Sequence, residues 1–344
     1  MRLLRIILFP LSIIYGTIMW LRNRLYDYEL IKSTSFKFPV VVIGNLAVGG
    51  TGKSPMAEYI LRLISPHKDI MLLSRGYGRK TKGLREVSGK DRVHLVGDEP
   101  LQIKRKFPNT KVFVCESRVF ALKKIGDNTP GVLLDDAYQH RSLRPSFTVL
   151  LFDYKSLLGP ILPLPTGNFR DGLSESKRAS IIVITKCPDK INPEIKFALE
   201  SRLRKYSSAR IFYAAISYGN LENDQKQTIT LDELYKYEVV LFTGIAKSEP
   251  LLFYLKYKVS ALKHIAFNDH HSYTSSDLKK ISNTFANILS EQKIIITTEK
   301  DFQRLPKSFT ESHPIYIVPI QQQILFGQKT AFDSTLRRAF HIEN

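Results

Sequence analysis

The chain has 344 residues, with 51 Lys and Arg against 32 Asp and Glu and a formal net charge of +19. This length is enough for about two domains. A hydrophobic content of 43%, a charged content of 24% and a mean hydropathy of −0.14 exclude a disordered or collagen-like chain and a protein with many membrane spans. The two cysteines, Cys115 and Cys187, match no disulfide framework or zinc ribbon, so we expect a reducing cytosolic compartment.

Three classes of anionic partner fit the isoelectric point near 9.7: nucleic acid, an acidic membrane surface and a phosphorylated substrate. The basic residues are spread along the chain, and no zinc-finger or RNA-recognition pattern is present. We therefore expect no nucleic-acid partner and favour the other two classes. A basic soluble protein without such a partner is the plainer alternative.

The first segment of the chain is apolar and lies between two basic flanks. No charge occurs from Ile6 to Leu21, and Pro10 interrupts this run, which is slightly shorter than the ~20 residues that span a bilayer. The flanking arginines are Arg2, Arg5, Arg22 and Arg24. Tyr15 and Trp20 are side chains that favour headgroup depth. We expect residues 1–30 to form a membrane-associated helix at the cytoplasmic leaflet and to contact an anionic membrane surface. Packing on the protein's own core and a single membrane span are the alternatives.

The next segment predicts a strand, a glycine-rich loop and a helix. Val40–Ile43 is a β-branched run typical of a buried parallel strand. The residues that follow it as a phosphate-binding loop are Gly49, Gly50, Thr51, Gly52, Lys53 and Ser54. Glycines let backbone N–H groups turn toward phosphate oxygens, and the helix N-terminus adds a favourable dipole. In this interpretation the loop binds ATP, Lys53 reaches the β- and γ-phosphates and the Ser54 hydroxyl ligates Mg²⁺.

The loop departs from the usual pattern at two places. Ala47 stands where the first glycine of the motif is usual. Val48 stands where one class of P-loop ATPases carries a lysine, which argues against that class. The remaining glycines still predict phosphate binding. The alternative is a glycine-rich turn with a chance lysine.

Three further segments carry side chains suited to phosphoryl transfer. Asp98 and Glu99 lie near an expected helix start, where acids also serve as caps. An apolar run ends in Asp135 and Asp136, as expected for a carboxylate pair that holds Mg²⁺. His270 lies beside a second histidine and an acid, before a helix expected near residue 276, and could act in an acid–base pair. Solvated surface acids, helix caps and a structural histidine are the alternatives.

Apolar strand candidates alternate with helical stretches along the chain. They are 39–43, 69–73, 111–114, 131–134, 148–152 and 180–184. This alternation predicts a doubly wound, mostly parallel α/β sheet of the P-loop type. A polar stretch at 219–230 marks a domain boundary, and strands expected at 238–244 and 293–297 predict a second, smaller α/β domain. The expected parts are 1–30, 31–218 and 219–344. The candidate site residues fall at strand ends, where ligands bind in such folds.

Taken together, the motifs resemble those of the tetraacyldisaccharide 4′-kinase (lipid A 4′-kinase) family. The matching segments are GNLAVGGTGKSP (44–55), SRGYGR (74–79), VGDEP (96–100), DDAYQH (135–140), ILPLPTGNFRDG (161–172), FNDHHSYT (267–274) and TTEKD (297–301). The resemblance implies transfer of the γ-phosphoryl group of ATP to the 4′-hydroxyl of tetraacyldisaccharide 1-phosphate, which gives lipid IVA. It also implies a peripheral or monotopic protein at the cytoplasmic face of the inner membrane. We expect no obligate protein partner.

The resemblance implies roles for residues at the nucleotide. Lys53 and Ser54 match the family's phosphate lysine and Mg²⁺ hydroxyl, with Ser in place of the commoner Thr. Asp135 and Asp136 match the carboxylate pair that serves catalysis and the metal. Glu99 is expected to help in positioning the metal or the base.

It implies roles at the acceptor as well. Asp98 matches a proposed general base, His270 a histidine that supports it, and Arg170 an arginine that stabilises the charge of the phosphoryl group in transfer. The residues expected at the substrate are Arg75, Tyr77, Arg79 and Asn168. Ala137 and Asn168 differ from the residues that are commoner in the family, which concerns the substrate cleft and not the reaction.

A P-loop NTPase switch that acts on a protein or nucleic-acid partner is the competing hypothesis. The strand expected at 180–184 ends in Thr185-Lys186, and residues 185–189 have a weak likeness to the NKxD loop of such switches. Dependence of ATP consumption on the lipid acceptor separates the two functions.

Overall fold

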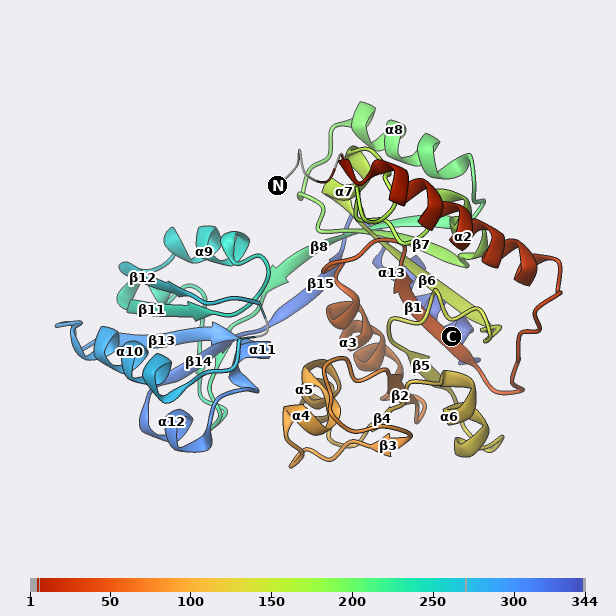
Figure 1. Ribbon diagram of the computed structural model, residues 1–344. Helices are drawn as coiled ribbons and strands as arrows, with labels where there is room; N and C mark the ends of the chain where they lie inside the picture. Colours follow the sequence, from red (N-terminus) through yellow and green to blue (C-terminus); the bar gives the residue numbers. More distant parts are fainter. Residues whose placement is uncertain (1–4, 6, 270, 343–344) are drawn as a thin grey trace. The chain divides into compact units, whose positions relative to one another are not determined.

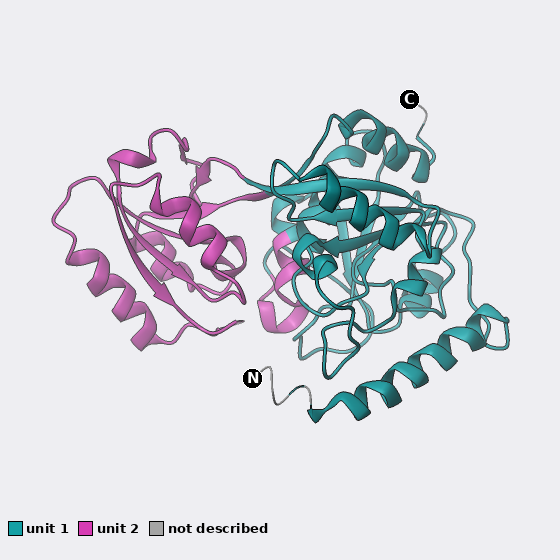
Figure 2. Cartoon of the chain, turned by 90° about the horizontal axis from the view of Figure 1, so that it is seen from above, with its two compact units in different colours: residues 1–90, 103–217, 321–344 teal, residues 91–102, 218–320 magenta. Residues whose placement is uncertain are grey.

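The computed structural model describes residue 5 and residues 7–269 and 271–342. The chain divides into two compact units (Figures 1 and 2). Unit 1 comprises residues 1–90, 103–217 and 321–344, and unit 2 comprises residues 91–102 and 218–320. The chain therefore leaves unit 1 twice and returns to it twice.

Unit 1 is built on a nine-stranded sheet in the order β15-β8-β7-β6-β1-β5-β2-β4-β3. Its strands are β1 (Val40–Asn45), β2 (Met71–Ser74), β3 (Arg85–Glu86), β4 (Lys111–Val114), β5 (Val132–Leu134), β6 (Phe147–Asp153), β7 (Ile181–Thr185), β8 (Arg210–Tyr218) and β15 (Ile320–Ile324). Neighbouring strands from β8 to β4 are parallel, and β3 is antiparallel to β4. Every residue of β1 and β7 is buried, as is typical of a parallel sheet that is covered on both faces. The predicted α/β class with a mostly parallel sheet is confirmed.

Helices connect the strands of unit 1, precede its first strand and follow its last one (Figure 1). They are α2 (Phe9–Asp27), α3 (Lys53–Ile64), α6 (Arg118–Ile125), α7 (Tyr154–Leu158), the 3₁₀ helix η1 (Leu173–Arg178), α8 (Pro193–Arg204) and α13 (Lys329–Ala339). Residues of α3 and α13 meet: the Tyr59 and Phe332 rings lie 5.6 Å apart, and the Tyr59 hydroxyl donates to Asp333 at 2.5 Å. The C-terminal helix thus stabilises the helix that follows the glycine-rich loop.

Unit 2 has a six-stranded sheet in the order β10-β9-β14-β13-β11-β12. Its strands are β9 (Leu221–Glu222), β10 (Thr228–Ile229), β11 (Glu238–Thr243), β12 (Ala261–Ala266), β13 (Lys293–Thr298) and β14 (Ile315–Val318). Its helices are α4 (Val93–Val96), the first turn of α5 (Asp98–Lys106), η2 (Leu234–Lys236), α9 (Glu249–Lys256), α10 (Ser275–Ala286), α11 (Glu299–Phe302) and α12 (Lys307–Ser312). The four strands β12, β11, β13 and β14 pair in parallel, while β9 and β10 form an antiparallel edge.

Two segments of the chain differ from the expected division into domains. The sequence predicts residues 321–344 in the smaller domain and residues 91–102 in the P-loop domain. Their contacts group residues 321–344 with unit 1 and residues 91–102 with unit 2. For residues 321–344 the cause is β15, which adds to the edge of the nine-stranded sheet beside β8; the Leu325 N–H donates to the Tyr213 carbonyl at 2.9 Å. Phe332 then packs edge-on against Phe212, with ring centroids 5.0 Å apart. The polar stretch at 219–230 does begin where the chain enters unit 2 for the second time, at residue 218.

Helix α2 has an unusual distribution of side chains. Its two buried residues are polar, Ser12 and Asn23. Its exposed large apolar residues are Phe9, Leu11, Ile13, Ile14, Ile18, Trp20 and Leu21. None of the helices in the described part of the chain combines the length and the apolar character that a bilayer crossing requires.

Candidate active site

The glycine-rich loop joins the end of β1 to the start of α3, as the sequence predicts. Gly52 precedes α3 with a φ of +82°, a left-handed conformation that glycine adopts without strain. A Cβ atom at this position would lie 2.6 Å from the Gln322 amide nitrogen. The backbone conformation therefore favours glycine here, and any side chain at this position would also displace the end of the Gln322 side chain.

The backbone of the loop is arranged to receive an anion. Among the described residues, none accepts a hydrogen bond from the N–H groups of residues 49–52. These groups lie ahead of the N-terminus of α3, where Lys53 and Ser54 are the first two helical residues. N–H groups without protein acceptors at a helix N-terminus form a site for phosphate.

Lys53 points toward polar groups at the ends of two neighbouring strands. Its ammonium group donates to the Asn45 side-chain oxygen at 3.3 Å and lies 3.5 Å from a carboxylate oxygen of Asp136. The Asn45 amide donates to the Thr51 hydroxyl at 2.9 Å. Asn45 thus links the loop to its lysine. No sequence motif singles out Asn45, although its place between strand and loop is a usable signal.

The predicted carboxylate pair lies at the end of β5. Because β1 and β5 pair in parallel, with Val42 opposite Leu134, Asp135 and Asp136 follow at the same edge as the loop. Asp135 is buried, and Asp136 has a φ of +49°. The structure thus brings Lys53 together with the pair.

Two arginines approach Asp136, one at its carboxylate and one at its backbone carbonyl. The Arg170 guanidinium lies 3.7 Å from an Asp136 carboxylate oxygen. Arg118, which sequence reasoning missed, is buried and donates to the Asp136 carbonyl at 3.4 Å. Burial and the positive charge of Arg75 lower the pKa of Arg118, while Asp135 and Asp136 act in the opposite direction. Arg118 also donates to the nearby Cys115 and Glu116 carbonyls, and no local pattern reveals its contact with Asp136, which follows another strand.

The loop 161–172 forms a short ribbon with the glycine-rich loop. The Val48 N–H donates to the Asn168 carbonyl at 2.7 Å, and the Arg170 N–H donates to the Leu46 carbonyl at 2.7 Å. The Arg5 side chain donates to the Asn168 side-chain oxygen at 3.1 Å. Two predicted site residues, Asn168 and Arg170, therefore lie directly beside the phosphate-binding loop.

The predicted substrate residues at 75–79 follow β2 and differ in their exposure and in their contacts. Arg75 and Tyr77 are exposed. Arg79 donates to the Gly83 carbonyl of its own loop at 2.7 Å and pairs with Glu116, which follows β4, at 2.6 Å. Glu116 also accepts from the Gly83 N–H at 3.0 Å. Arg79 therefore holds the shape of the loop that presents Arg75 and Tyr77.

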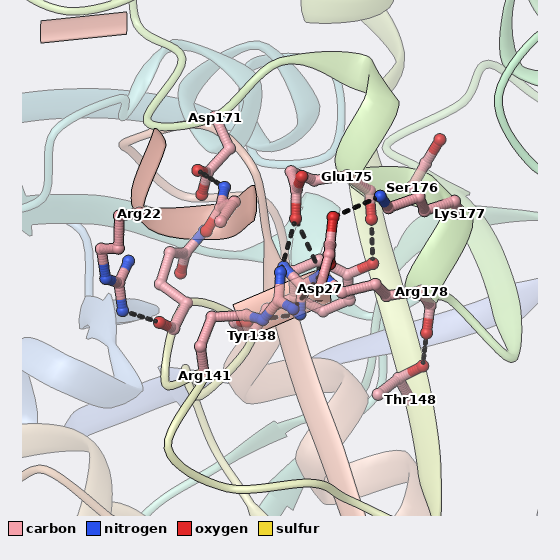
Figure 3. A network of polar contacts seen from close by, with 12 residues as sticks. Arg22, Asp27, Tyr138, Arg141, Thr148, Asp171, Glu175, Ser176, Lys177 and Arg178 are labelled. Carbon is pink, nitrogen blue, oxygen red and sulfur yellow. Dashed lines mark hydrogen bonds and ion pairs between the residues drawn. The ribbon is translucent and has the colours of Figure 1, made fainter. Parts of the chain in front are cut away.

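A polar network fastens α2 to the rest of unit 1 (Figure 3). The Asn23 amide donates to Asp171 at 3.0 Å, and Arg22 donates to the Gln139 carbonyl at 2.8 Å. Asp27 accepts from Arg141 at 2.8 Å and from Lys177 at 2.7 Å. Burial alone would raise the pKa of Asp27, but these hydrogen bonds outweigh burial and lower it. Polar contacts with unit 1 thus cover one side of α2.

A cavity of about 220 Å³ lies between α2 and the loop 161–172. Its lining includes apolar residues from both elements: Met19, Trp20, Ile161, Pro163 and Phe169. Arg170 and Asp171 lie at its polar side. The cavity therefore has an apolar wall on one side and, on the other, Arg170, which lies beside Asp136.

In unit 2, the predicted acids Asp98 and Glu99 begin α5 and face basic residues near α11. Asp98 is 6% exposed as a residue, and its carboxylate pairs with Arg304. Glu99 pairs with Lys300 at 2.5 Å. Burial favours a higher pKa for Glu99, but the charge and hydrogen bond of Lys300 outweigh it and lower the pKa. Sequence reasoning missed Arg304, which follows the TTEKD segment by three residues.

His270 lies outside the described residues, so its predicted place is not tested. Its neighbour His271 stacks on Phe267, with ring centroids 4.7 Å apart, and lies 3.0 Å from an Asp277 carboxylate oxygen. Hydrogen bonds from the Thr274 side chain and backbone, and then from His271, lower the pKa of Asp277 to about 2. These contacts secure the start of α10.

No cluster of three or more His, Cys, Asp or Glu side chains suited to a metal ion occurs in residues 5, 7–269 and 271–342. Ser54 and the carboxylate pair nevertheless fit Mg²⁺, which is commonly held by one or two carboxylates together with water and substrate phosphates. Their ligand atoms are all oxygen, the kind of ligand that Mg²⁺ prefers.

The fold and the site define a P-loop nucleotide-binding protein: a parallel sheet, a glycine-rich loop before a helix, its lysine, and a carboxylate pair at the end of a neighbouring strand. The family model described as tetraacyldisaccharide-1-P 4′-kinase matches residues 4–341. The chain belongs to this family.

Individual relatives agree with the family assignment. The chain is 38% identical over 339 residues to a tetraacyldisaccharide 4′-kinase of Flavobacterium johnsoniae, with 98% of this chain and 97% of the relative covered. It is 35% identical over 344 residues to one of Bacteroides thetaiotaomicron, with 95% and 90% covered. A crystal structure of LpxK from Aquifex aeolicus in complex with ATP superposes with a TM-score of 0.77 and 28% identity, covering 98% of this chain and all of that chain.

Proposed function

We propose that this protein transfers the γ-phosphoryl group of ATP to the 4′-hydroxyl of tetraacyldisaccharide 1-phosphate, giving lipid IVA. One observation carries the proposal: in a chain that matches the 4′-kinase family over residues 4–341, Lys53 and Arg170 both approach Asp136 beside the glycine-rich loop. Phosphoryl transfer needs alignment and charge neutralisation more than covalent help from the protein, and this cluster of charges supplies both.

The residues of unit 1 would bind the phosphates of ATP, hold the metal ion and stabilise the charge of the transferred group. The N–H groups of residues 49–52 and the Lys53 ammonium bind the phosphates of ATP. Ser54, Asp135 and Asp136 would hold Mg²⁺, whose positive charge offsets that of the phosphates when it is bound. Arg170 lies 3.7 Å from Asp136 and stabilises negative charge on the phosphoryl group in transfer.

The acceptor hydroxyl must lose a proton, and we assign this step to Asp98. A carboxylate base contributes about 10²–10⁴-fold to such a reaction. His270 remains the predicted partner of Asp98, and Glu99 remains a predicted aid to the metal or the base. Arg304 pairs with Asp98 in the structure, and we assign it to positioning that carboxylate.

The acceptor carries four acyl chains, and α2 supports its delivery from a membrane. The large apolar side chains of α2 are exposed, while its polar side chains fasten it to unit 1. We propose that α2 lies on the cytoplasmic face of the inner membrane with this apolar side in the lipid. Arg24, which is exposed and stacks over Trp20 at 5.5 Å, would face anionic headgroups. Arg75, Tyr77 and Asn168 are the residues proposed to contact the disaccharide phosphate.

The test is transfer of labelled phosphate from ATP to purified tetraacyldisaccharide 1-phosphate in detergent with Mg²⁺. We expect labelled lipid from the native chain and a loss of at least 10³-fold in Lys53→Ala, because one charge-neutralising group at the phosphates is removed. Lys190→Ala changes an exposed lysine and serves as the control. ATP consumption that does not depend on the lipid, with no labelled product, would contradict the proposal and favour the NTPase switch.

A further inference from the structure

Three successive carbonyl groups of the glycine-rich loop are held by side chains from outside the motif. The Gly50 carbonyl accepts a hydrogen bond from the Lys186 ammonium. The Thr51 carbonyl accepts from the Thr185 hydroxyl at 2.8 Å. The Gly52 carbonyl accepts from the Gln322 amide at 3.3 Å. These donors come from the end of β7 and from β15, which lie far from the loop in sequence.

This arrangement sets the direction in which the loop presents its polar groups. A peptide unit that turns its carbonyl toward one side turns its N–H toward the other. Carbonyl oxygens that faced the phosphates would repel them, and carbonyls left without partners would be costly to bury. Side chains that hold the carbonyls of residues 50–52 therefore keep the N–H groups of the same loop free for phosphate, in agreement with their lack of acceptors among the described residues.

Lys186 is held in place on two sides. Its ammonium group lies 3.4 Å from an Asp153 carboxylate oxygen as well as on the Gly50 carbonyl. Its backbone has a φ of +56°, which is uncommon for a residue with a side chain. The next residue is fixed by a hydrogen bond from the Cys187 N–H to the Ala214 carbonyl at 3.0 Å. Backbone strain of this kind persists where the surrounding structure imposes it.

Thr185 supports the same loop from the interior. It is fully buried at the last position of β7, opposite Asp153 of β6. Its hydroxyl is within hydrogen-bond distance of the Phe152 carbonyl, at 3.1 Å, in addition to the Thr51 carbonyl. The strand end thus presents two consecutive donors to two consecutive carbonyls of the loop.

We propose that Lys186 is a positioning residue for nucleotide binding: it acts through the Gly50 carbonyl to fix the loop whose N–H groups bind phosphate, with Thr185 and Gln322 in the same role at the next two carbonyls. The inference rests on the proposed function only in taking ATP as the nucleotide. The ion pair with Asp153 holds the Lys186 ammonium at the Gly50 carbonyl.

The variants are chosen to separate positioning from general stability. Lys186→Met keeps the length of the side chain and removes the donor. Thr185→Val keeps the shape and removes the hydroxyl. Lys186→Arg keeps a charged donor, and Lys190→Met changes an exposed lysine four residues away as the matched control.

The experiment is calorimetric titration of each full-length variant with a non-hydrolysable ATP analogue and Mg²⁺, without lipid. We expect the Kd of Lys186→Met to rise by about 10-fold or more, since a charge-assisted hydrogen bond is lost. Thr185→Val is expected to weaken binding by about 3- to 10-fold, because its lost hydrogen bond is neutral. Lys186→Arg is expected to recover most of the affinity, and Lys190→Met to bind like the native chain.

Steady-state transfer adds a readout that a general structural defect would not give. We expect the KM for ATP to rise in Lys186→Met while the KM for the lipid stays within twofold of the native value. A Kd within twofold of native for both Lys186→Met and Thr185→Val would overturn the proposal, as would an equal loss in Lys190→Met. Because the titration omits the lipid, failure of the 4′-kinase activity would appear separately, as a native chain that binds the analogue but labels no lipid.

Discussion

Helices α2 and α3 belong to the same unit but turn opposite kinds of side chain toward the protein. Helix α3 buries Met56, Ile60 and Ile64 and begins at Lys53, the proposed phosphate-binding lysine. Helix α2 buries Ser12 and Asn23 and exposes most of its large apolar side chains. Burying a large apolar side chain is worth about 1.5–3 kcal/mol. Helix α3 gains this energy within the protein, whereas the exposed apolar side chains of α2 would gain it only against another apolar phase.

The comparison explains how one unit can serve a water-soluble nucleotide and a lipid. Helix α3, which buries its apolar side chains, fixes the nucleotide loop, and the position of α3 does not depend on the membrane. The helix with the inverted pattern is held by hydrogen bonds and ion pairs, such as Asn23 with Asp171 and Asp27 with Arg141. The loop 161–172, which contacts both α2 and the glycine-rich loop, connects the two helices.

The largest expected effect comes from making the exposed side of α2 polar. The change is Ile13→Asn, Ile14→Asn and Ile18→Asn together, three side chains that are all more than half exposed. We expect binding to anionic lipid vesicles to fall by about 10³-fold or more, since three apolar side chains no longer enter the lipid. ATP binding should not change. Sedimentation with vesicles measures the first quantity, and equal sedimentation of native and variant chains would contradict the proposed membrane contact.

Shortening the Ile60 side chain in α3 to alanine should lower the stability of the protein, while the same change at Ile14 in α2 should not. Ile60 is fully buried, and Ile60→Ala is expected to reduce the free energy of unfolding by about 2–5 kcal/mol. Ile14 is more than half exposed, and Ile14→Ala is expected to change it by less than about 0.5 kcal/mol. Urea denaturation in the absence of lipid measures both. Similar losses in the two variants would show that the helices do not differ in the way described.

A smaller effect is expected where α2 is fastened to unit 1. Asn23→Ala removes the hydrogen bond to the buried Asp171 and should weaken the attachment of α2 by about 1–3 kcal/mol. Amide hydrogen exchange of residues 9–27 measures this change, which should appear as faster exchange across the helix. Arg24→Ala, at an exposed position of the same helix, is the control. Unchanged exchange in Asn23→Ala would mean that other contacts hold α2.

The smallest expected effect is a dependence on pH that involves His140. Burial, and then the charges of Arg118, Arg22 and Arg75, lower the pKa of His140 from 6.5 to about 4. Between these values the unfolded chain binds more protons at this site than the folded one, so the contribution of His140 to stability increases with pH and levels off above 6.5. After allowance for solvent screening, the size is of the order of 1 kcal/mol.

Denaturation of the native chain and His140→Gln at pH 5 and pH 7 measures this contribution. The native chain should gain more stability than the variant between the two values. A larger gain in the variant would give the opposite sign and would exclude a lowered pKa for His140 in the folded protein.

Much of the sheet and of the phosphate loop could be predicted because their signals are local. Runs such as Val40–Ile43 and Ile181–Ile184 are continuous and apolar, as strands buried on both faces must be. Lys53 and Gly52 follow the first of these runs at the spacing that a phosphate loop requires. Such features need no knowledge of what the rest of the chain does.

The missed residues act through contacts between segments that are distant in sequence. Gln322 is one of three consecutive glutamines, and only the pairing of β15 beside β8 determines that its side chain reaches Gly52. Arg304 and Arg118 were missed for the same reason. Arg79 was predicted at the substrate from its motif, but the motif does not reveal its ion pair with Glu116.

We propose that α2 contacts the membrane and that α3 fixes the nucleotide loop. The most direct test of these separate roles is phosphate transfer to the lipid in two settings, detergent micelles and vesicles. The chain with the three Ile→Asn changes in α2 is predicted to match the native chain in detergent, where the lipid is dispersed, and to lose at least 10-fold on vesicles. Lys53→Ala is predicted to fail in both. Equal activity of the α2 variant and the native chain on vesicles would contradict the account.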